Sequence, residues 1–309
     1  MNRRNTEFLS LALLILLLVA YYVSGWKAAP CSDSILSALA AVIIILLIGR
    51  ILGVINRKML TGSSLLPPLF YAFLAAANPG AFCFSMLHVV AVLLAVSIYS
   101  YLCFNALSPS LSSLSSMWLT LGCAGLLMPP LMWLAPVYAF TSVGKAEEKL
   151  KFWFIALFGL AIPTAVWLGV FYLMGDTTPV GSFFADHYWK GMTAVQALAF
   201  YHSTPTLCRI LIVAVIALVA MVRILSQLTT YKTSQFHACL RLILLTLCLG
   251  VLVLLFLGDA ATPAGMLLSI PLAPLLGIYF ETARNRIAAS SLLIVLALLM
   301  IAERVSHFV

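Results

Sequence analysis

Long apolar runs, separated by short polar connections, recur along almost the whole chain and limit what it can fold into. Several of these runs approach or exceed the roughly 18 apolar residues that mark a membrane-spanning helix. Of the 309 residues, 64% are hydrophobic and 8% are charged, whereas a soluble domain carries about 25% charged residues. The sequence therefore predicts an all-α protein, a polytopic transmembrane helical bundle in which residues 1–309 form a single integral membrane domain.

The apolar runs predict about eleven spans (10–12), joined by loops rich in turn residues. The first run follows Arg3 and Arg4, and we expect it to be an uncleaved span rather than a signal peptide. Six serines in residues 108–116 predict a flexible connector. The polar stretch 174–205 predicts an extracytoplasmic loop with a helix lying in the interface. The expected spans are 8–25, 36–55, 65–79, 82–104, 117–128, 130–144, 152–173, 207–227, 238–257, 263–280 and 287–302.

Residues 117–144 form either one span kinked at Pro129-Pro130 or a short broken helix pair. Each half has only ~12–15 residues, about 18–22 Å of helix against a hydrocarbon core of about 30 Å, and this length favours one span. Charge favours two passes, because 13 of the 17 Lys and Arg residues then fall on the cytoplasmic side, against a split of 8 to 9 for one span. We therefore expect two passes, a cytoplasmic N-terminus and an extracytoplasmic C-terminus. A broken pair also points to a functional cavity.

The formal net charge of +8 does not indicate nucleic-acid binding, because the basic residues stand singly at the ends of apolar runs. The sequence contains no phosphate-binding loop, nucleophile elbow, zinc-protease helix or dinucleotide fingerprint, so we expect no cofactor. The seven cysteines include no C-x-x-C pair. Their spacing predicts neither a metal site nor a disulfide framework.

The predicted orientation places all four aspartates on the extracytoplasmic side. Asp33 lies in the first external loop, where it either caps the helix that follows or acts as a catalytic base. Asp186, His187 and Lys190 lie among aromatic residues of the long loop. These three residues either belong to an interfacial belt or bind a polar or phosphate-bearing headgroup.

Two further residues are candidates for substrate binding. His88 lies about two turns from the outer end of its span, where a hydrogen-bonded structural role is as plausible as a functional one. Arg209 stands at the outer start of a span, against the orientation rule. Its side chain either reaches the headgroups or pairs with an aspartate or a phosphate.

Four segments carry a resemblance to a known family: Asn56-Arg57-Lys58, Leu66-Pro67-Pro68-Leu69-Phe70-Tyr71, Gly122 to Trp133 and Phe158 to Pro163. With these segments, residues 1–175 resemble an uncharacterised family of multispanning inner-membrane proteins of Bacteroidota. The resemblance implies a multi-pass location in the bacterial cytoplasmic (inner) membrane and carries no established activity. The helix of small residues, the Pro-Pro break and the Trp-bearing second helix are also distantly similar to the membrane core of GT-C glycosyltransferases. Those enzymes use polyprenyl-phosphate-linked sugars and an external acidic residue, whose position Asp33 matches.

Three functions remain open at this point. The first is a GT-C-like protein that handles a polyprenyl-phosphate-linked sugar at the extracytoplasmic face. The second is a transporter or lipid-carrier flippase, which the many spans and the broken helices favour. The third is a non-catalytic scaffold of an envelope complex. All three predict membrane lipids as partners, and the first two predict a polyprenyl-phosphate lipid.

Overall fold

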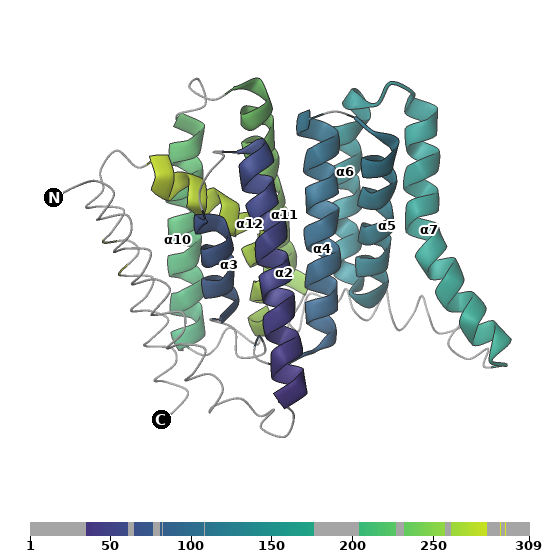
Figure 1. The fold of residues 1–309 in the computed structure, drawn as a ribbon, viewed down its shortest axis with the longest axis horizontal. Coiled ribbons are helices and arrows are strands. Elements are labelled where there is room, and N and C mark those ends of the chain that lie inside the picture. The colour runs from purple at the N-terminus through teal and green to yellow at the C-terminus, as the bar shows by residue number, and fades with distance from the viewer. Residues whose placement is uncertain are drawn as a thin grey trace.

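A computed structural model describes most of the central part of the chain, and all of that part is helical or connects helices (Figure 1). The predicted span 8–25, all but two residues of the predicted span 287–302, and most of the loop 174–205 lie outside the described residues. The described residues are 35–60, 65–76, 81, 83–107, 109–175, 204–226, 232–256 and 261–282, with Ser291 and Ile294. The α-helices are α2 (Ile35–Met59), α3 (Leu66–Ala76), α4 (Met86–Leu102), α5 (Leu111–Leu127), α6 (Leu134–Ser142), α7 (Lys149–Leu173), α10 (Thr204–Ser226), α11 (Thr233–Phe256) and α12 (Ala261–Thr282).

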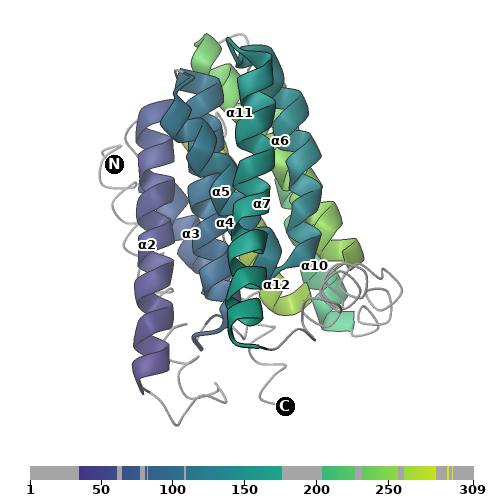
Figure 2. The same ribbon diagram turned by 90° about the vertical axis from the view of Figure 1, so that its right-hand side faces the viewer.

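Most of the helices run nearly parallel or antiparallel to one another in both views of the molecule, whereas the C-terminal part of α12 runs across them (Figures 1 and 2). Within the described residues, four helices are long and apolar enough to cross a membrane: Leu36–Met59, Met86–Leu107, Lys149–Leu173 and Thr233–Val253. Four others are apolar but shorter. Each predicted span between residues 36 and 280 coincides with a described helix to within a few residues, apart from a longer N-terminal extension of α5. The total of about eleven crossings stays a prediction.

Residues 117–144 form a helical hairpin that turns at Met128. Residues before the turn lie beside residues after it: Gly125 is against Met132, and the rings of Trp118 and Tyr138 are 6.2 Å apart. A 3₁₀ helix, η3 (Pro129–Trp133), carries the chain from α5 into α6. The chain therefore reverses direction at the Pro-Pro break, as two passes require and one kinked span does not.

The serine-rich segment 108–116 is not a flexible connector over its whole length, because α5 begins at Leu111. The Ser110 hydroxyl caps the helix by accepting a hydrogen bond from the Ser113 amide, at 3.2 Å. Inside the helix, Ser113 and Ser115 donate to the carbonyls of Ser110 and Ser112. These local bonds satisfy hydroxyls that would otherwise disfavour a helix.

α5 and α7 pack closely because glycines face each other at their contact. A Cβ atom added at Gly122 would lie 2.6 Å from the Gly159 carbonyl oxygen, and one added at Gly159 would lie 2.5 Å from Trp118 Cβ. Small residues at helix contacts allow backbones to approach within membranes. α7 contains Pro163, and the C-terminal end of this helix diverges from the bundle (Figure 1).

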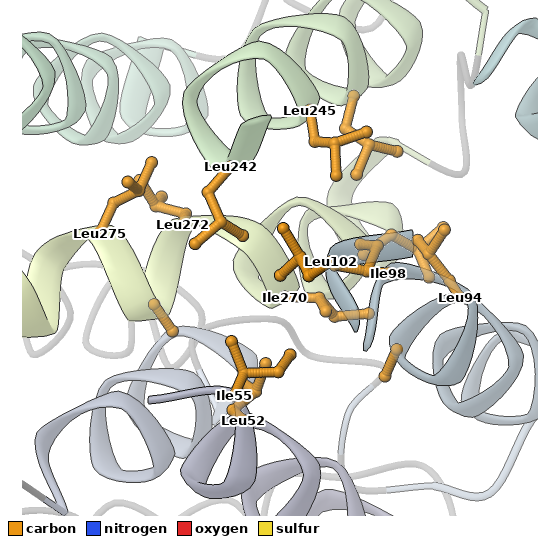
Figure 3. Packing of buried hydrophobic residues seen from close by; sticks show 14 of the residues in the cluster. Leu52, Ile55, Leu94, Ile98, Leu102, Leu242, Leu245, Ile270, Leu272 and Leu275 are labelled. Atoms are coloured by element: carbon orange, nitrogen blue, oxygen red, sulfur yellow. The ribbon is translucent and has the colours of Figure 1, made fainter. Parts of the chain in front are cut away.

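α12 lies at the centre of the bundle and contacts α2, α3, α4, α10 and α11. Its nine consecutive residues 271–279 are all buried. Figure 3 shows its apolar side chains between those of α11 on one side and those of α2 and α4 on the other. α3 is held against both α12 and α2 by prolines: Pro67 meets Gly277, and Pro68 meets Gly49 and Gly53.

Candidate functional site

Most of the residues that the sequence singled out lie where the structure gives no side-chain description. Asp33, Asp186, His187 and Lys190 lie outside the described residues. Arg209 is in the second turn of α10, but its side chain is also outside the description. The catalytic role expected of Asp33 and the headgroup-binding role of the other four residues therefore stay predictions.

His88 is described, and its ring closes the first turn of α4. Nε2 donates to the Ala81 carbonyl at 3.2 Å, because that oxygen can only accept. Nδ1 then accepts from the backbone amide of Ser85 at 3.3 Å. The ring is fully buried. Both ring nitrogens thus bond to the segment that leads into α4, which gives His88 the position and contacts of a helix cap.

A cluster of polar side chains lies at the other end of α4, where the helix continues as a π-helical turn, η2 (Cys103–Leu107). About 17 residues separate this turn from His88, equivalent to roughly 25 Å of helix. The cluster, which we call the Arg241 cluster, joins α4 to α6 and α11. Its members are Tyr101, Asn105, Tyr138, Thr141, Ser142 and Arg241.

Arg241 carries the charge of this cluster and is only 9% exposed. It lies about 12 Å from the start of α11, inside the part of the helix that is long and apolar enough to span a membrane. Nη1 donates to the carbonyls of Asn105, at 3.4 Å, and His237, at 3.5 Å. Nε is buried without a hydrogen-bond partner.

The structure shows no negative charge beside this guanidinium among the described residues. The three acidic side chains described, Glu147, Glu148 and Glu281, are exposed, and the one ion pair found there joins Glu148 to Lys151. The charged groups that act on the nearby His237 are both basic, Arg241 and Lys145. A buried charge normally pairs with an opposite charge or a ligand. The described part of the cluster is therefore a cationic site without its own counter-ion.

Asn105 contributes an unsatisfied acceptor to the same cluster. Its Nδ2 donates to the Tyr101 carbonyl at 2.9 Å and to Ser142 Oγ at 2.7 Å, which fixes the orientation of the amide. Its Oδ1 is buried and has no partner. Asn105 lies within the π-helical turn, and such turns occur frequently at functional sites because they displace a side chain from the regular helix register.

Hydroxyl groups and stacked rings hold the cluster in place. The Thr141 hydroxyl donates to the Val137 carbonyl at 2.6 Å, so the Tyr101 hydroxyl donates to Thr141 at 2.7 Å. The Tyr101 oxygen also acts electrostatically on Arg241. The rings of Tyr101 and Tyr138 stack with centroids 4.4 Å apart. The aromatic pair and the hydroxyl chain therefore fix α6 against α4 on one side of the guanidinium.

Arg241 is one of the 13 basic residues that fall on the predicted cytoplasmic side, and it lies inside the predicted span 238–257. An arginine within a span was the one available signal of the cluster. Asn105 follows the predicted span 82–104 directly, and nothing in the sequence indicates that the helix becomes a π-helix there. Tyr101 and Tyr138 stand in apolar runs without a distinguishing pattern.

The arrangement is suited to binding an anion that also carries a hydroxyl or other donor. An unpaired Nε donor and a positive charge would meet the anion, and the unpaired Oδ1 would accept from the donor. Within the described residues, no group of three or more His, Cys, Asp or Glu side chains could hold a metal ion. Comparisons with protein-family models, with curated proteins and with solved structures find no match to this chain.

Proposed function

We propose that this chain is a multi-pass protein of the bacterial cytoplasmic (inner) membrane that moves a phosphate-bearing lipid, of the polyprenyl-phosphate class, between leaflets. The observation that carries the proposal is the buried guanidinium of Arg241, which has no carboxylate beside it among the described residues. The phosphate of the lipid would supply the missing negative charge. The apolar chain would lie along the lipid-facing surface of the bundle.

The ligand class follows from the groups that remain unsatisfied. A guanidinium fork matches a phosphate and forms charge-assisted hydrogen bonds with it. Leaving a buried donor or acceptor unpaired costs about 1–3 kcal/mol, so a ligand that pairs both Arg241 Nε and Asn105 Oδ1 gains stabilisation twice. A phosphate carrying a sugar or another hydroxyl-bearing group supplies both partners.

Movement of a lipid is favoured over its chemical conversion for two reasons. The described residues around Arg241 include no carboxylate that could serve as a general base. The elements around the cluster are also irregular: α4 ends in a π-helical turn, and α5 and α6 meet at a 3₁₀ helix. Irregular turns of this kind are where helices bend, and they mark hinges in many membrane transporters.

The proposal includes an orientation, in which the Arg241 cluster faces the cytoplasm. The end of α2 and the start of α11 meet at this end of the bundle, since Gln235 Nε2 donates to the Leu60 carbonyl and Arg241 donates to Asn105. The start of α7 lies there too, since the rings of Phe104 and Phe152 are 6.4 Å apart. Basic residues are enriched on cytoplasmic ends. The lipid would therefore enter from the cytoplasmic leaflet, with the N-terminus cytoplasmic and the C-terminus extracytoplasmic. The basic residues at these helix ends are Arg57, Lys58, Lys149, Lys151 and Lys232.

A binding measurement on the purified full-length protein tests the phosphate site. A short-chain polyprenyl phosphate is compared with the polyprenol that lacks the phosphate, using native mass spectrometry in detergent. Arg241→Gln removes the charge and should weaken phosphate binding about 10- to 100-fold, because a hydrogen bond to a charged group contributes about 1.5–3 kcal/mol. The matched control Arg57→Gln removes an exposed charge and should change binding by about twofold or less.

Transport itself is measured in vesicles that contain the protein and a fluorescent polyprenyl phosphate. Dithionite added outside quenches only the outer leaflet, so lipid movement shows as loss of the protected half of the signal. We expect this loss with wild-type protein and with Arg57→Gln, and its absence with Arg241→Gln. Equal binding of the phosphate and the polyprenol, or unchanged movement with Arg241→Gln, would show that the cluster does not have this function.

A further inference from the structure

Cys83 forms a disulfide bond, contrary to the expectation from the cysteine spacing. Cys103, Cys123, Cys239 and Cys248 are free thiols. The chain has seven cysteines, so the partner of Cys83 is one of the two that remain, Cys31 or Cys208. Spacing alone missed the bond because a disulfide depends on which segments the fold brings together.

The contacts next to Cys83 favour Cys31 as its partner. The backbone amide of Phe84 donates to the Ser37 hydroxyl at 2.9 Å, which joins the first turn of α2 to the segment that contains Cys83. Cys31 precedes Ser37 by six residues, and a chain of that length reaches at most about 20 Å. Cys208 belongs to α10, and Figure 1 shows α10 and α4 on opposite sides of α2 and α3.

We propose that a Cys31–Cys83 disulfide closes the start of α2 onto the start of α4 and marks this end of the bundle as the extracytoplasmic face. When the bond forms, two thiols lose two protons and two electrons. A protein disulfide of the oxidising compartment accepts them by thiol–disulfide exchange and is reduced to a dithiol. Such bonds persist outside the bacterial cytoplasm and are rare within it.

The dimensions of α4 extend this assignment to the other end of the molecule. Cys83 precedes α4 by three residues, and Met86 and Asn105 are 19 residues apart along a nearly continuous helix, which corresponds to about 28 Å and is close to a hydrocarbon core of about 30 Å. Cys103, at the Asn105 end, is a free thiol. The disulfide therefore places the Arg241 cluster on the cytoplasmic side, by an observation independent of charge counting and of what the cluster binds.

Thiol labelling of the full-length protein tests the bond and its partner. Cells are acid-quenched, free thiols are blocked, and maleimide-polyethylene glycol is added with or without prior reduction. Reduction should expose two new thiols in the wild type and in Cys208→Ser, and should expose none in Cys83→Ser or Cys31→Ser. Wild-type protein that gains no label after reduction would overturn the proposal, as would loss of the gain in Cys208→Ser.

A second measurement tests the face. A membrane-impermeant phosphine reductant should open the bond in right-side-out spheroplasts and leave it closed in sealed inside-out vesicles. The opposite pattern would place Cys83 on the cytoplasmic side and overturn the assignment. Either result can be read on wild-type protein, so it does not depend on the folding of a variant. Failure of the lipid-binding test would leave these labelling patterns unchanged.

Discussion

The glycine contact between α5 and α7 allows a stability prediction with a control in the same helix. Gly159→Ala places a Cβ atom 2.5 Å from Trp118 Cβ and 3.1 Å from the backbone nitrogen of Leu119. Ordinary contacts of this kind begin at 3.4 Å. Neither neighbouring atom is the end of a flexible side chain, so the two helices must move apart by about 0.9 Å to restore an ordinary contact. A gap of that size removes a quarter to a half of the dispersion energy of the atoms that line it.

The matched control is Gly169→Ala, ten residues further along α7, where an added Cβ meets nothing within 4 Å. Both substitutions gain the same helix propensity, about 1 kcal/mol. The difference between the two variants is therefore the cost of overpacking, about 1–3 kcal/mol. For folded units of 150–250 residues, 1 kcal/mol shifts the melting temperature by about 2–4 °C. We expect Gly159→Ala to melt about 2–12 °C below Gly169→Ala.

The assay is thermal denaturation of the detergent-purified protein, followed by the loss of the monodisperse peak in fluorescence-detected size-exclusion chromatography. Heating times must be identical, because irreversible unfolding makes the midpoint depend on rate. Gly122→Ala, whose Cβ would lie 2.6 Å from the Gly159 carbonyl oxygen, should behave like Gly159→Ala. A Gly159→Ala protein that melts at or above the Gly169→Ala midpoint would refute the close packing of α5 on α7.

Two further predictions concern helix caps. His88→Ala leaves the Ala81 carbonyl and the Ser85 amide without their ring partners and should destabilise the protein by about 1–3 kcal/mol. His88→Gln can still bond the Ser85 amide and should lose less stability. Equal melting temperatures for the two variants would contradict the capping role. Ser110→Ala removes the N-cap of α5 and should cost about 1 kcal/mol. Hydrogen exchange would show this as faster exchange of the Ser113 amide, and an unchanged rate would mean that the hydroxyl does not stabilise the first turn.

Between residues 36 and 280 the sequence predicted the helices to within a few residues, because membrane helices leave a strong signal. Each span must be apolar over its length, since its backbone groups bond internally and its side chains face lipid or other helices. The same principle, combined with the placement of basic residues, selected two passes for residues 117–144, and the structure contains the corresponding hairpin. The prediction of a flexible connector over residues 108–116 was wrong, because α5 begins at Leu111. Serine hydroxyls such as that of Ser113 bond to nearby carbonyls and are thereby tolerated inside the helix.

The site was harder to predict because it depends on contacts between distant segments. Asn105 and Arg241 are 136 residues apart and meet only after the bundle forms. The disulfide of Cys83 likewise depends on the approach of α2 to the start of α4, seen in the bond between Ser37 and Phe84. Composition and periodicity report whether a segment is a helix, and they carry no information about which helices become neighbours.

The packing of the short helix α3 on α12 has a consequence for how the protein is made. The described helix has 11 residues, about 16 Å, roughly half of the hydrocarbon thickness. Its side chains rest on α12, where Pro67 meets Gly277 and the rings of Phe70 and Phe280 stack 5.0 Å apart. α12 leaves the ribosome about 200 residues after α3, at roughly 5–20 residues per second. During synthesis, α3 therefore waits on the order of 10–40 seconds for its main packing partner, and in a chain halted before residue 261 it packs on α2 without α12.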